Sequence, residues 1–331
     1  MNGLPRRVIV TTVPFGTIDP RPLDLLRQAG VECVINPLGR KLRPEEVGDI
    51  IRGFPVVVAG TEIIDAATIR SCPDLRAICR VGIGLDGVDL LAARRQSVAV
   101  SYTPDGPSAA VGELTVGLIL DLLRGIGRAD RSLRGGVWTR VTGRRIATSV
   151  VGIVGMGRIG KRVARHLRNG FPGVRILAND IAPDDEARAL DVEWVEKEEI
   201  WRRCDVITLH VPLGRDTVGM ISAPQIEMMR PDAVLVNTAR GGIINEADLA
   251  HALGQGRIAG VAVDVFVDEP YGGPLVQHDN AVLTCHMGSM TADCRVRMEL
   301  EAVMEAIRFL DGQPLASPVP EGEYEARGEA E

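Results

Sequence analysis

Short apolar, β-branched segments alternate with segments of helical periodicity from the start of the chain. Strands are predicted at residues 8–14, 31–36, 55–60, 75–81 and 98–104. Helices are predicted between them, near residues 22–29, 44–52, 65–70 and 89–96. Because each strand is followed by a helix that returns the chain, successive strands run in the same direction. The first third of the chain therefore predicts a parallel α/β sheet.

A long helical segment then interrupts this alternation. Its apolar positions recur with helical spacing from Val111 to about Leu133. The strand pattern then restarts, with further strands predicted at 149–155, 174–180, 204–212, 233–239, 260–266 and 281–285. The chain is thus expected to form two sheets. A last helix at 291–310 follows the second sheet, and the pattern alone leaves open which sheet it packs on.

Composition narrows the function classes. A chain of 331 residues with 45% hydrophobic residues is long enough for about two globular domains. The net charge of -6 provides no overall positive field for nucleic acid. The one arginine-rich stretch, 124–145, is interpreted as a solvated or subunit-facing helix rather than a nucleic-acid patch. No apolar run approaches the length that spans a bilayer.

The cysteines and the two ends of the chain point to a reducing compartment. The six cysteines lack the spacing of zinc ligands, and no metal site is predicted. The first residues run directly into a strand without a secretory leader, so a cytoplasmic location is expected. The charged tail at 321–331 is expected to be disordered.

The pattern G-x-G-x-x-G occurs twice, and its context favours the second copy as a dinucleotide site. Gly155, Gly157 and Gly160 join a predicted strand to a predicted helix, with Arg158 and Ile159 between them. Such glycines let the helix amides meet a pyrophosphate, and Arg158 and Lys161 add no negative charge there. Asp180 follows the next strand, where a carboxylate accepts hydrogen bonds from ribose hydroxyls and repels the additional phosphate of NADP. NAD(H) is therefore predicted as the cofactor, in preference to NADP.

The first copy, at Gly82, Gly84 and Gly87, carries Asp86 and Asp89 beside it, which disfavours a pyrophosphate. Its local sequence favours a plain turn between strand and helix. Exposed amides at Val81 and Gly82 would alternatively form a cradle for an anion.

Three polar residues follow the ends of predicted strands in the second sheet. They are Arg240, Glu269 and His286, and ligands of open α/β sheets bind at the carboxyl ends of strands. Taken singly, each is as compatible with an ordinary surface or structural role. Among the other histidines, only His210 also ends a strand, and we favour a structural role for it near the adenine side.

Together these three residues make a chemical set. Arg240, with the Val81 and Gly82 amides, would hold a substrate carboxylate. His286 would exchange a proton with the substrate hydroxyl, and Glu269 would fix the ring tautomer and favour the imidazolium. With NAD carrying the hydride, this set predicts oxidation of a 2-hydroxy acid or reduction of a 2-oxo acid.

Five stretches of the chain resemble the D-isomer-specific 2-hydroxyacid dehydrogenase family. They are RVGIGLDGVDL, VGIVGMGRIGKRVA, CDVITLHVPLGRDTVGMI, VNTARGGIINEADLAHALGQGRIAGVAVDVFVDEP and LTCHMGSMT. The N-terminal segments are most similar to the phosphoglycerate dehydrogenase-like branch. The resemblance extends to about Leu310.

The resemblance implies two Rossmann- or flavodoxin-like parallel-sheet domains with an active-site cleft between them. Residues 1–103 and 288–331 would form a discontinuous substrate domain. Residues 104–287 would form the NAD-binding domain, with a helix that joins a homodimer. Arg240, Glu269 and His286 would have the catalytic roles given above.

The resemblance also implies further cofactor contacts. Asp264 and the backbone of Ala239 and Gly288 would lie near the nicotinamide, and Thr217 near the adenosine half. The cofactor set then comprises the motif residues 155 and 157–160 with Asp180, His210, Val211, Pro212, Thr217, Thr238, Ala239, Arg240, Asp264, His286 and Gly288.

Departures from the family pattern bear on the substrate. Cys285 stands where a proline usually precedes the histidine, and we interpret it as a buried filler. Pro107 replaces a frequent asparagine, and Thr61 and Glu62 replace an arginine that would favour a phosphate. An apolar or hydroxylated side group is therefore expected on the substrate, rather than a phosphate. A non-catalytic NAD(H)-sensing protein and a formate- or phosphite-type dehydrogenase on the same fold are the alternatives.

Overall fold

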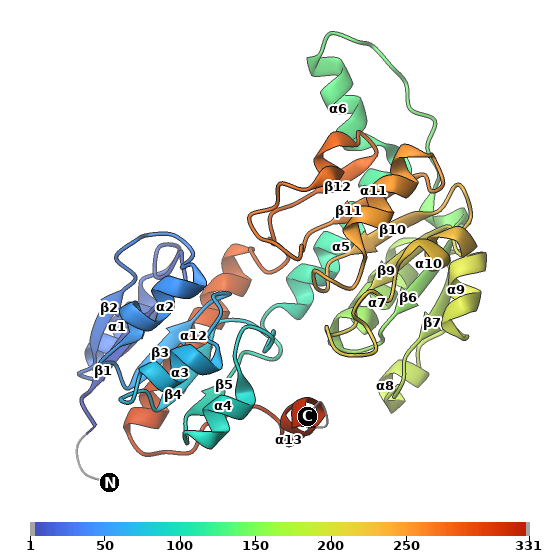
Figure 1. Cartoon of the computed structure of the whole chain (residues 1–331). Coiled ribbons are helices and arrows are strands. Elements are labelled where there is room, and N and C mark those ends of the chain that lie inside the picture. The colour runs from blue at the N-terminus through green and yellow to red at the C-terminus, as the bar shows by residue number, and fades with distance from the viewer. Residues whose placement is uncertain (1–3, 329–331) are drawn as a thin grey trace. The chain divides into compact units, whose positions relative to one another are not determined.

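The computed structural model describes residues 4–328, and the chain divides into two compact units (Figure 1). Unit 1 extends to Pro107 and resumes at Met290, so it is built from both ends of the chain. Unit 2 is the continuous segment Ser108–Ser289. Each unit contains one parallel sheet.

The sheet of unit 1 has five strands in the order β2-β1-β3-β4-β5. The strands are β1 (Arg7–Val10), β2 (Glu32–Ile35), β3 (Val56–Ala59), β4 (Ala77–Arg80) and β5 (Ala99–Ser101). Each pair is parallel, and β3 and β4 are buried throughout, as their uninterrupted apolar sequence requires. This is the flavodoxin-like strand order.

Helices cover both faces of this sheet. They are α1 (Arg21–Gln28), α2 (Pro44–Ile51), α3 (Ala66–Ser71), α4 (Leu90–Arg95), α12 (Ala292–Leu310) and α13 (Glu321–Gly328). The starts of α3 and α4 follow from their caps, because Asp65 accepts from the Thr68 amide at 2.7 Å and Asp89 from the Ala92 amide at 2.8 Å. One core cluster joins α2, α3 and α4 to the sheet, while α12 packs on β3 and β4 beside α1.

The C-terminal segment corrects one expectation. The tail expected to be disordered forms α13 up to Gly328, and its last three residues lie outside the described part. Arg94 binds Glu321 with two hydrogen bonds of 2.7 and 2.6 Å, and its guanidinium lies 3.6 Å from the centre of the Tyr324 ring. A high charge content predicted disorder, but a paired arginine over an aromatic ring orders this segment.

The sheet of unit 2 has seven strands in the order β12-β11-β10-β9-β6-β7-β8. Its strands are β6 (Val150–Val154), β7 (Arg175–Asn179), β8 (Glu193–Trp194), β9 (Val206–Leu209), β10 (Val234–Asn237), β11 (Gly260–Val263) and β12 (Ala281–Leu283). All pairs are parallel. The sequence missed only β8, whose two residues are too few to show a period. The prediction of two parallel-sheet α/β domains is confirmed.

The helices of unit 2 contain a second correction. They are α5 (Ser108–Arg124), α6 (Ile126–Arg134), α7 (Arg158–Gly170), α8 (Asp185–Arg188), α9 (Lys197–Arg203), α10 (Ala223–Met228) and α11 (Glu246–Gly254), with short 3₁₀ turns η1 (Ile146–Thr148) and η2 (Pro274–Gln277). The single helix predicted from Val111 to Leu133 is two helices. Gly125 separates them with a left-handed φ of 61°, and the Gly127 amide turns to the Asp121 carboxylate at 2.7 Å. In the part of the chain that the structure describes, no helix has the length and apolarity to cross a membrane.

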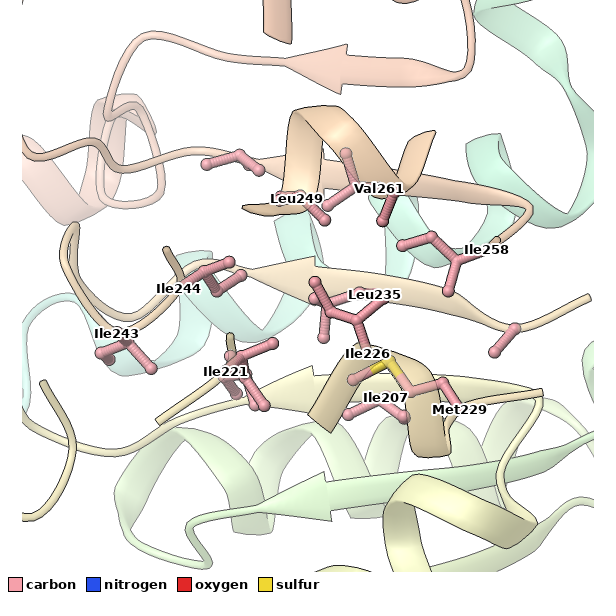
Figure 2. Packing of buried hydrophobic residues seen from close by; sticks show 14 of the residues in the cluster. Ile207, Ile221, Ile226, Met229, Leu235, Ile243, Ile244, Leu249, Ile258 and Val261 are labelled. Carbon is pink, nitrogen blue, oxygen red and sulfur yellow. The ribbon is translucent and has the colours of Figure 1, made fainter. Parts of the chain in front are cut away.

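The two faces of this sheet have separate cores. The face that packs on α9, α10 and α11 contains Ile207, Leu235 and Val261, as Figure 2 shows for the central strands. The face that packs on α5 and α7 contains residues one position away along the strands, such as Val206 and Val234. This alternation follows from the two-residue period of a strand. Burial on both faces leaves the ends of the strands as the accessible positions.

Candidate active site

The predicted site residues follow neighbouring strands at the carboxyl edge of the unit 2 sheet. Across the sheet, His286 follows β12, Glu269 follows β11, and Arg240 follows β10. Further along the same edge are the loop after β9, the glycine loop after β6, and Asp180 after β7. The strand order reverses direction between β9 and β6, and open α/β sheets bind ligands at such a point.

His286 and Glu269 form a direct pair. The Nδ1 atom of His286 lies 2.9 Å from Oε1 and 3.0 Å from Oε2 of Glu269. An ionised carboxylate only accepts hydrogen bonds, so this contact places the ring hydrogen on Nδ1. The other ring nitrogen, Nε2, is then left to exchange a proton with a ligand.

The backbone of His286 is held in an uncommon conformation. Its φ is 49°, which lies in the left-handed region and is more common for glycine than for histidine. The buried Asp264 stabilises this loop, because its backbone oxygen accepts from the His286 amide at 2.7 Å. Its carboxylate accepts from the Met287 and Gly288 amides, each at 2.9 Å, and from the Thr284 hydroxyl at 2.6 Å. Backbone strain of this kind is concentrated at functional sites.

The loop that carries Arg240 packs against the loop that carries Glu269. A Cβ on Gly241 would lie 2.1 Å from the backbone carbon and oxygen of Phe266, so only glycine allows this approach. The Phe266 amide in turn donates to Oε1 of Glu269 at 3.2 Å. The Arg240 backbone oxygen accepts from the Asn237 side chain at 2.8 Å. Sequence reasoning missed Gly241, although a glycine directly after a strand-end arginine was the available signal.

The three glycines after β6 have three different functions. Gly155 has a φ of 93°, and a Cβ there would lie 2.5 Å from the His210 backbone oxygen. A Cβ on Gly160 would lie 2.0 Å from the Gly155 oxygen, so this residue permits close packing of α7 on the strand. A Cβ on Gly157 would meet nothing within 4 Å. Gly157 therefore leaves open space before the first turn of α7, where a ligand phosphate would approach the amides.

Asp180 lies beside this glycine loop. Its Oδ2 accepts from the Met156 amide at 2.6 Å, and its Oδ1 accepts from the Ala182 amide at 2.8 Å. A carboxylate has about four acceptor positions, so these two bonds leave capacity for two hydroxyl groups. The next residue, Ile181, is 99% exposed. A single exposed apolar side chain is common on protein surfaces, so Ile181 by itself does not indicate a ligand.

The two basic residues of the glycine motif differ in position. Arg158 is exposed at the first position of α7. Lys161 is buried, and its Nζ lies 2.5 Å from both Asp184 and Glu186, so it ties α7 to α8. The positive charge of Lys161 is therefore engaged by these two carboxylates, and Arg158 is the exposed basic residue of the motif.

His210 ends β9 beside the glycine loop. Its Nε2 lies 3.0 Å from the Thr208 hydroxyl, while Nδ1 is buried without a hydrogen-bond partner within the described chain. Burial lowers the pKa of His210 to about 3, so the ring is neutral at physiological pH. A buried polar atom without a partner at this edge fits a site that a ligand completes.

The remaining predicted cofactor residues lie in the same loops. The Thr238 hydroxyl lies 2.9 Å from that of Thr115 on α5, and the Ala239 amide donates to Asn237 at 3.0 Å. The Thr217 hydroxyl donates to the Pro212 oxygen at 2.6 Å. Val211 is partly buried and packs against the core of unit 2.

The first glycine copy lies in unit 1, and its amides are not exposed as expected. The Val81 amide donates to the Ala59 oxygen at 2.8 Å, because the strand pairing continues one residue past β4. The Gly82 amide donates to the Thr103 hydroxyl at 2.9 Å. A cradle for an anion would require Gly82 to exchange this hydroxyl for the ligand.

Two other residues differ from the sequence interpretation. Glu62 was interpreted as a carboxylate that would disfavour a phosphate at this place, but its side chain is buried and accepts from the Gly60 amide at 3.0 Å and from the Thr11 hydroxyl. Cys285, interpreted as a buried filler, is exposed. The strand β12 ends at Leu283, earlier than its apolar sequence indicated, so Cys285 lies in the following loop and outside the core.

Comparison with known proteins identifies the family of the chain. The family model described as D-isomer specific 2-hydroxyacid dehydrogenase, NAD binding domain, matches residues 116–288. A D-3-phosphoglycerate dehydrogenase of Sus scrofa is 33% identical over 320 residues, which are 95% of this chain and 58% of that protein. The chain thus spans little more than half the length of this relative.

Two further proteins match this chain over most of its length and over most of their own length. A glyoxylate reductase of Thermofilum pendens is 36% identical over 263 residues, 76% of this chain and 77% of that protein. The crystal structure of the TT0316 protein from Thermus thermophilus has a TM-score of 0.86 at 31% identity, covering 95% of this chain and 100% of that one. On the family model and these relatives, the chain belongs to the D-isomer specific 2-hydroxyacid dehydrogenase family.

Proposed function

We propose that the protein is an NAD(H)-dependent oxidoreductase that interconverts a D-2-hydroxy acid and the corresponding 2-oxo acid. The observation that carries the proposal is the hydrogen-bonded His286–Glu269 pair, at the same sheet edge as Arg240 and the glycine loop. An acid/base pair, a guanidinium and a phosphate-binding turn on one edge are the groups that this reaction needs. The pair also favours this reaction over a formate- or phosphite-type dehydrogenase, which the sequence left open.

The residues at this edge fit a dinucleotide. Gly157 leaves open space at the N-terminus of α7, Asp180 keeps acceptor capacity for ribose hydroxyls, and Ile181 offers an apolar surface for adenine. The predicted contacts of the loops after β9, β10 and β11, including Asp264, extend this site toward His286. We propose that unit 2 holds the cofactor in this way and that unit 1 recognises the substrate.

When bound, the nicotinamide supplies or accepts the hydride at the substrate's C2 atom. In reduction, His286 donates a proton from Nε2 to the oxygen on C2, and in oxidation it takes that proton back. Glu269 holds Nδ1–H and stabilises the charged ring with its own negative charge. Arg240 binds the substrate carboxylate with its planar fork and so fixes the C2 atom in position.

The substrate's side group is proposed to be uncharged. Three of the loops at the carboxyl end of the unit 1 sheet, residues 11–17, 60–63 and 81–87, contain no lysine or arginine, whereas the loop after the edge strand β2 contains Arg40, Lys41 and Arg43. Two buried arginines reach these loops, but Arg295 is already paired with Glu299, and Arg80 donates to the Gly60 and Gly84 oxygens. A phosphate dianion there would lose its hydration without gaining an exposed cation from these three loops. Because Glu62 is buried, repulsion by its carboxylate no longer explains why a phosphate is disfavoured, and the lack of an exposed cation on these loops takes its place. We keep the expectation of an apolar or hydroxylated side group. The predicted contributions of Val81 and Gly82 remain part of this proposal.

A direct assay tests the proposed reaction. Purified protein is mixed with NADH and a panel of 2-oxo acids, and absorbance is followed at a wavelength of about 340 nm, where NADH but not NAD absorbs. Turnover with at least one unphosphorylated acid is expected. Tight NADH binding without turnover of any acid would instead support the non-catalytic sensor.

Asp180 is expected to determine the preference for NADH over NADPH. Asp180→Ser should raise the ratio of kcat/KM for NADPH over NADH by about 10- to 100-fold, because it removes both the ribose acceptor and the repulsion of the 2′-phosphate. The ratio is measured with the best acid of the panel. Asp185→Ser, on the exposed surface of α8, is the matched control and should leave the ratio unchanged.

We further propose that the chain forms a homodimer through unit 2. The helix α6 has no buried residue, and the segment after it leaves Trp138 79% exposed. Ile126, Leu133 and Val137 of the same region are each 56% exposed. An apolar surface of this kind around a tryptophan is typical of a protein interface. The arginine-rich stretch is helical only as far as Arg134, so the predicted subunit-facing helix is shorter than expected.

Light scattering after size exclusion tests this interface. The protein should have twice the mass of one chain, and Trp138→Asp should raise the dimer dissociation constant by about 30-fold or more. Val276→Asp is the control, since Val276 is 52% exposed in unit 2 but lies outside this region. A monomeric wild-type protein, or equal effects of both substitutions, would exclude this interface.

The cysteines bear on location. All six are free in the structure, and burial raises the pKa of Cys79 and of Cys204 to about 12. Thiols without disulfides fit a reducing compartment. We propose a cytoplasmic location on this basis.

A further inference from the structure

Unit 1 has buried charges at the carboxyl end of its sheet. Among its described residues, five charged side chains are buried, namely Glu62, Arg80, Arg295, Glu299 and Glu305. The first four contact loops that follow β1, β3 or β4. Burying a charge is unfavourable, and apolar residues would close a sheet end with less loss of hydration. These four charges therefore require an explanation beyond packing.

Arg295 and Glu299 reach from α12 to one loop. They form an ion pair at 2.7 Å, with side chains that are 7% and 4% exposed. The Nη2 atom of Arg295 donates to the Thr12 hydroxyl at 2.8 Å and to the Pro14 oxygen at 2.5 Å. The Oε2 atom of Glu299 accepts from the Gly16 amide at 2.9 Å. The pair therefore holds three points of the loop Thr12–Gly16.

Within the loop, Phe15 is buried, while the backbone at Gly16 has a conformation that few other residues adopt. Gly16 has a left-handed φ of 64°, and a Cβ there would lie 2.6 Å from the Leu23 side chain. The loop begins directly after β1, at the sheet end where α/β units bind ligands. Val13, Pro14 and Gly16 are partly exposed, so the loop presents an apolar surface with a fixed outline.

We propose that the Arg295–Glu299 pair is a positioning device for the loop Thr12–Gly16, and that through this loop it determines which side group the substrate carries. The proposal rests on the proposed function. Arg295 and Glu299 are positioning residues and do not touch the reacting atoms. Glu62 and Arg80 hold the neighbouring loops in the same way, through Gly60 and Gly84.

The same helix contains a matched control. Arg297 and Glu301 form an ion pair with the same spacing and the same distance of 2.7 Å, but Arg297 is 57% exposed. This second pair has the same residue types on the same helix, and its hydrogen bond joins Arg297 to Glu301 rather than to the loop Thr12–Gly16. Comparison of the two pairs separates loop positioning from helix stability.

The experiment compares Arg295→Met with Arg297→Met in the full chain. KM and kcat are measured for a series of 2-oxo acids that differ only in the side group, and the NADH dissociation constant is measured by fluorescence. Arg295→Met should raise KM for the best acid by about 10- to 100-fold and reduce the preference among the acids, with NADH binding unchanged. Arg297→Met should change neither KM nor the preference among the acids by more than about two-fold.

A milder variant covers the case in which Arg295→Met does not fold. Glu299→Gln keeps an oxygen that can accept from the Gly16 amide but removes the charge, so a rise in KM of about three- to ten-fold is expected. Hydrogen exchange at the Gly16 amide should become faster in Glu299→Leu and remain unchanged in Glu301→Leu. Wild-type turnover with unchanged KM and unchanged preference in the folded Arg295 or Glu299 variant would overturn the inference alone. Absence of wild-type turnover with every acid would overturn the proposed function, and the inference with it.

Discussion

Replacing His286 by alanine should lower kcat for 2-oxo acid reduction by about 100- to 10,000-fold, which is the usual contribution of a positioned acid. The loss arises because the proton that Nε2 of His286 would donate is then no longer supplied by a positioned group. The NADH dissociation constant should change by less than about two-fold, because the glycine loop and Asp180 lie after other strands. Stopped-flow absorbance and fluorescence titration measure the two quantities.

Two further variants make this result specific. His251→Ala removes an exposed histidine of α11 and should have full activity. Glu269→Gln should lower kcat by about 10- to 100-fold, since the amide cannot stabilise the charged ring. Unchanged kcat in His286→Ala would remove the histidine from the mechanism.

Replacing Arg240 by alanine should lower kcat/KM for the 2-oxo acid by about 100- to 10,000-fold. Two charge-assisted hydrogen bonds to a carboxylate are lost, and each contributes about 1.5–3 kcal/mol. Most of the effect should be in KM, because the carboxylate is bound in both the ground state and the transition state. Arg240→Lys should recover only part of it, since an ammonium group has no planar fork.

An arginine at the opposite end of the sheet is the control for Arg240. Arg230 pairs with Asp232 at 3.1 Å, just before β10 begins. Arg230→Ala should leave kcat/KM within about two-fold of the wild-type value. If Arg240→Ala kept its affinity for the acid, or if Arg230→Ala lowered kcat/KM by as much as Arg240→Ala, the carboxylate would have to bind elsewhere.

The sequence predicted the sheets well because their strands are buried on both faces. Uninterrupted apolar runs such as Val56–Ala59 have no stable alternative to a central strand. The three strand-end residues were predicted for the same reason, since a polar side chain directly after such a run must lie at the sheet edge. Which of these strand-end residues are neighbours depends on the order of the strands in the sheet. Local sequence patterns do not contain that order.

The wrong predictions concern features that the spacing of apolar residues does not record. The helix break at Gly125 leaves the apolar spacing on either side intact, so periodicity did not detect it. Nothing near Glu62 in the sequence indicated that its carboxylate would turn inward to Thr11 and Gly60. The order in the tail depends on Arg94, more than two hundred residues earlier.

Some contacts in the site could not be predicted because they depend on which segments the fold brings together. Asp264 was predicted near the nicotinamide by resemblance, and the structure adds that it accepts four hydrogen bonds from the loop of His286. The glycine after Arg240 was a signal of a close backbone approach, but only the folded chain shows that the backbone of Phe266 is what lies beside Gly241. The amides of Val81 and Gly82 have partners that only the folded chain supplies.

The central claim is that His286, Glu269 and Arg240 act on one molecule bound at the carboxyl edge of the unit 2 sheet. A crystal structure of the full chain with NADH and oxamate, an unreactive analogue of a 2-oxo acid, tests it most directly. The account predicts the pyrophosphate at Gly157, the oxamate carboxylate on Arg240, and Nε2 of His286 within about 3.2 Å of the C2 oxygen. Oxamate bound without contact to either His286 or Arg240, or NADH bound away from the glycine loop, would contradict it.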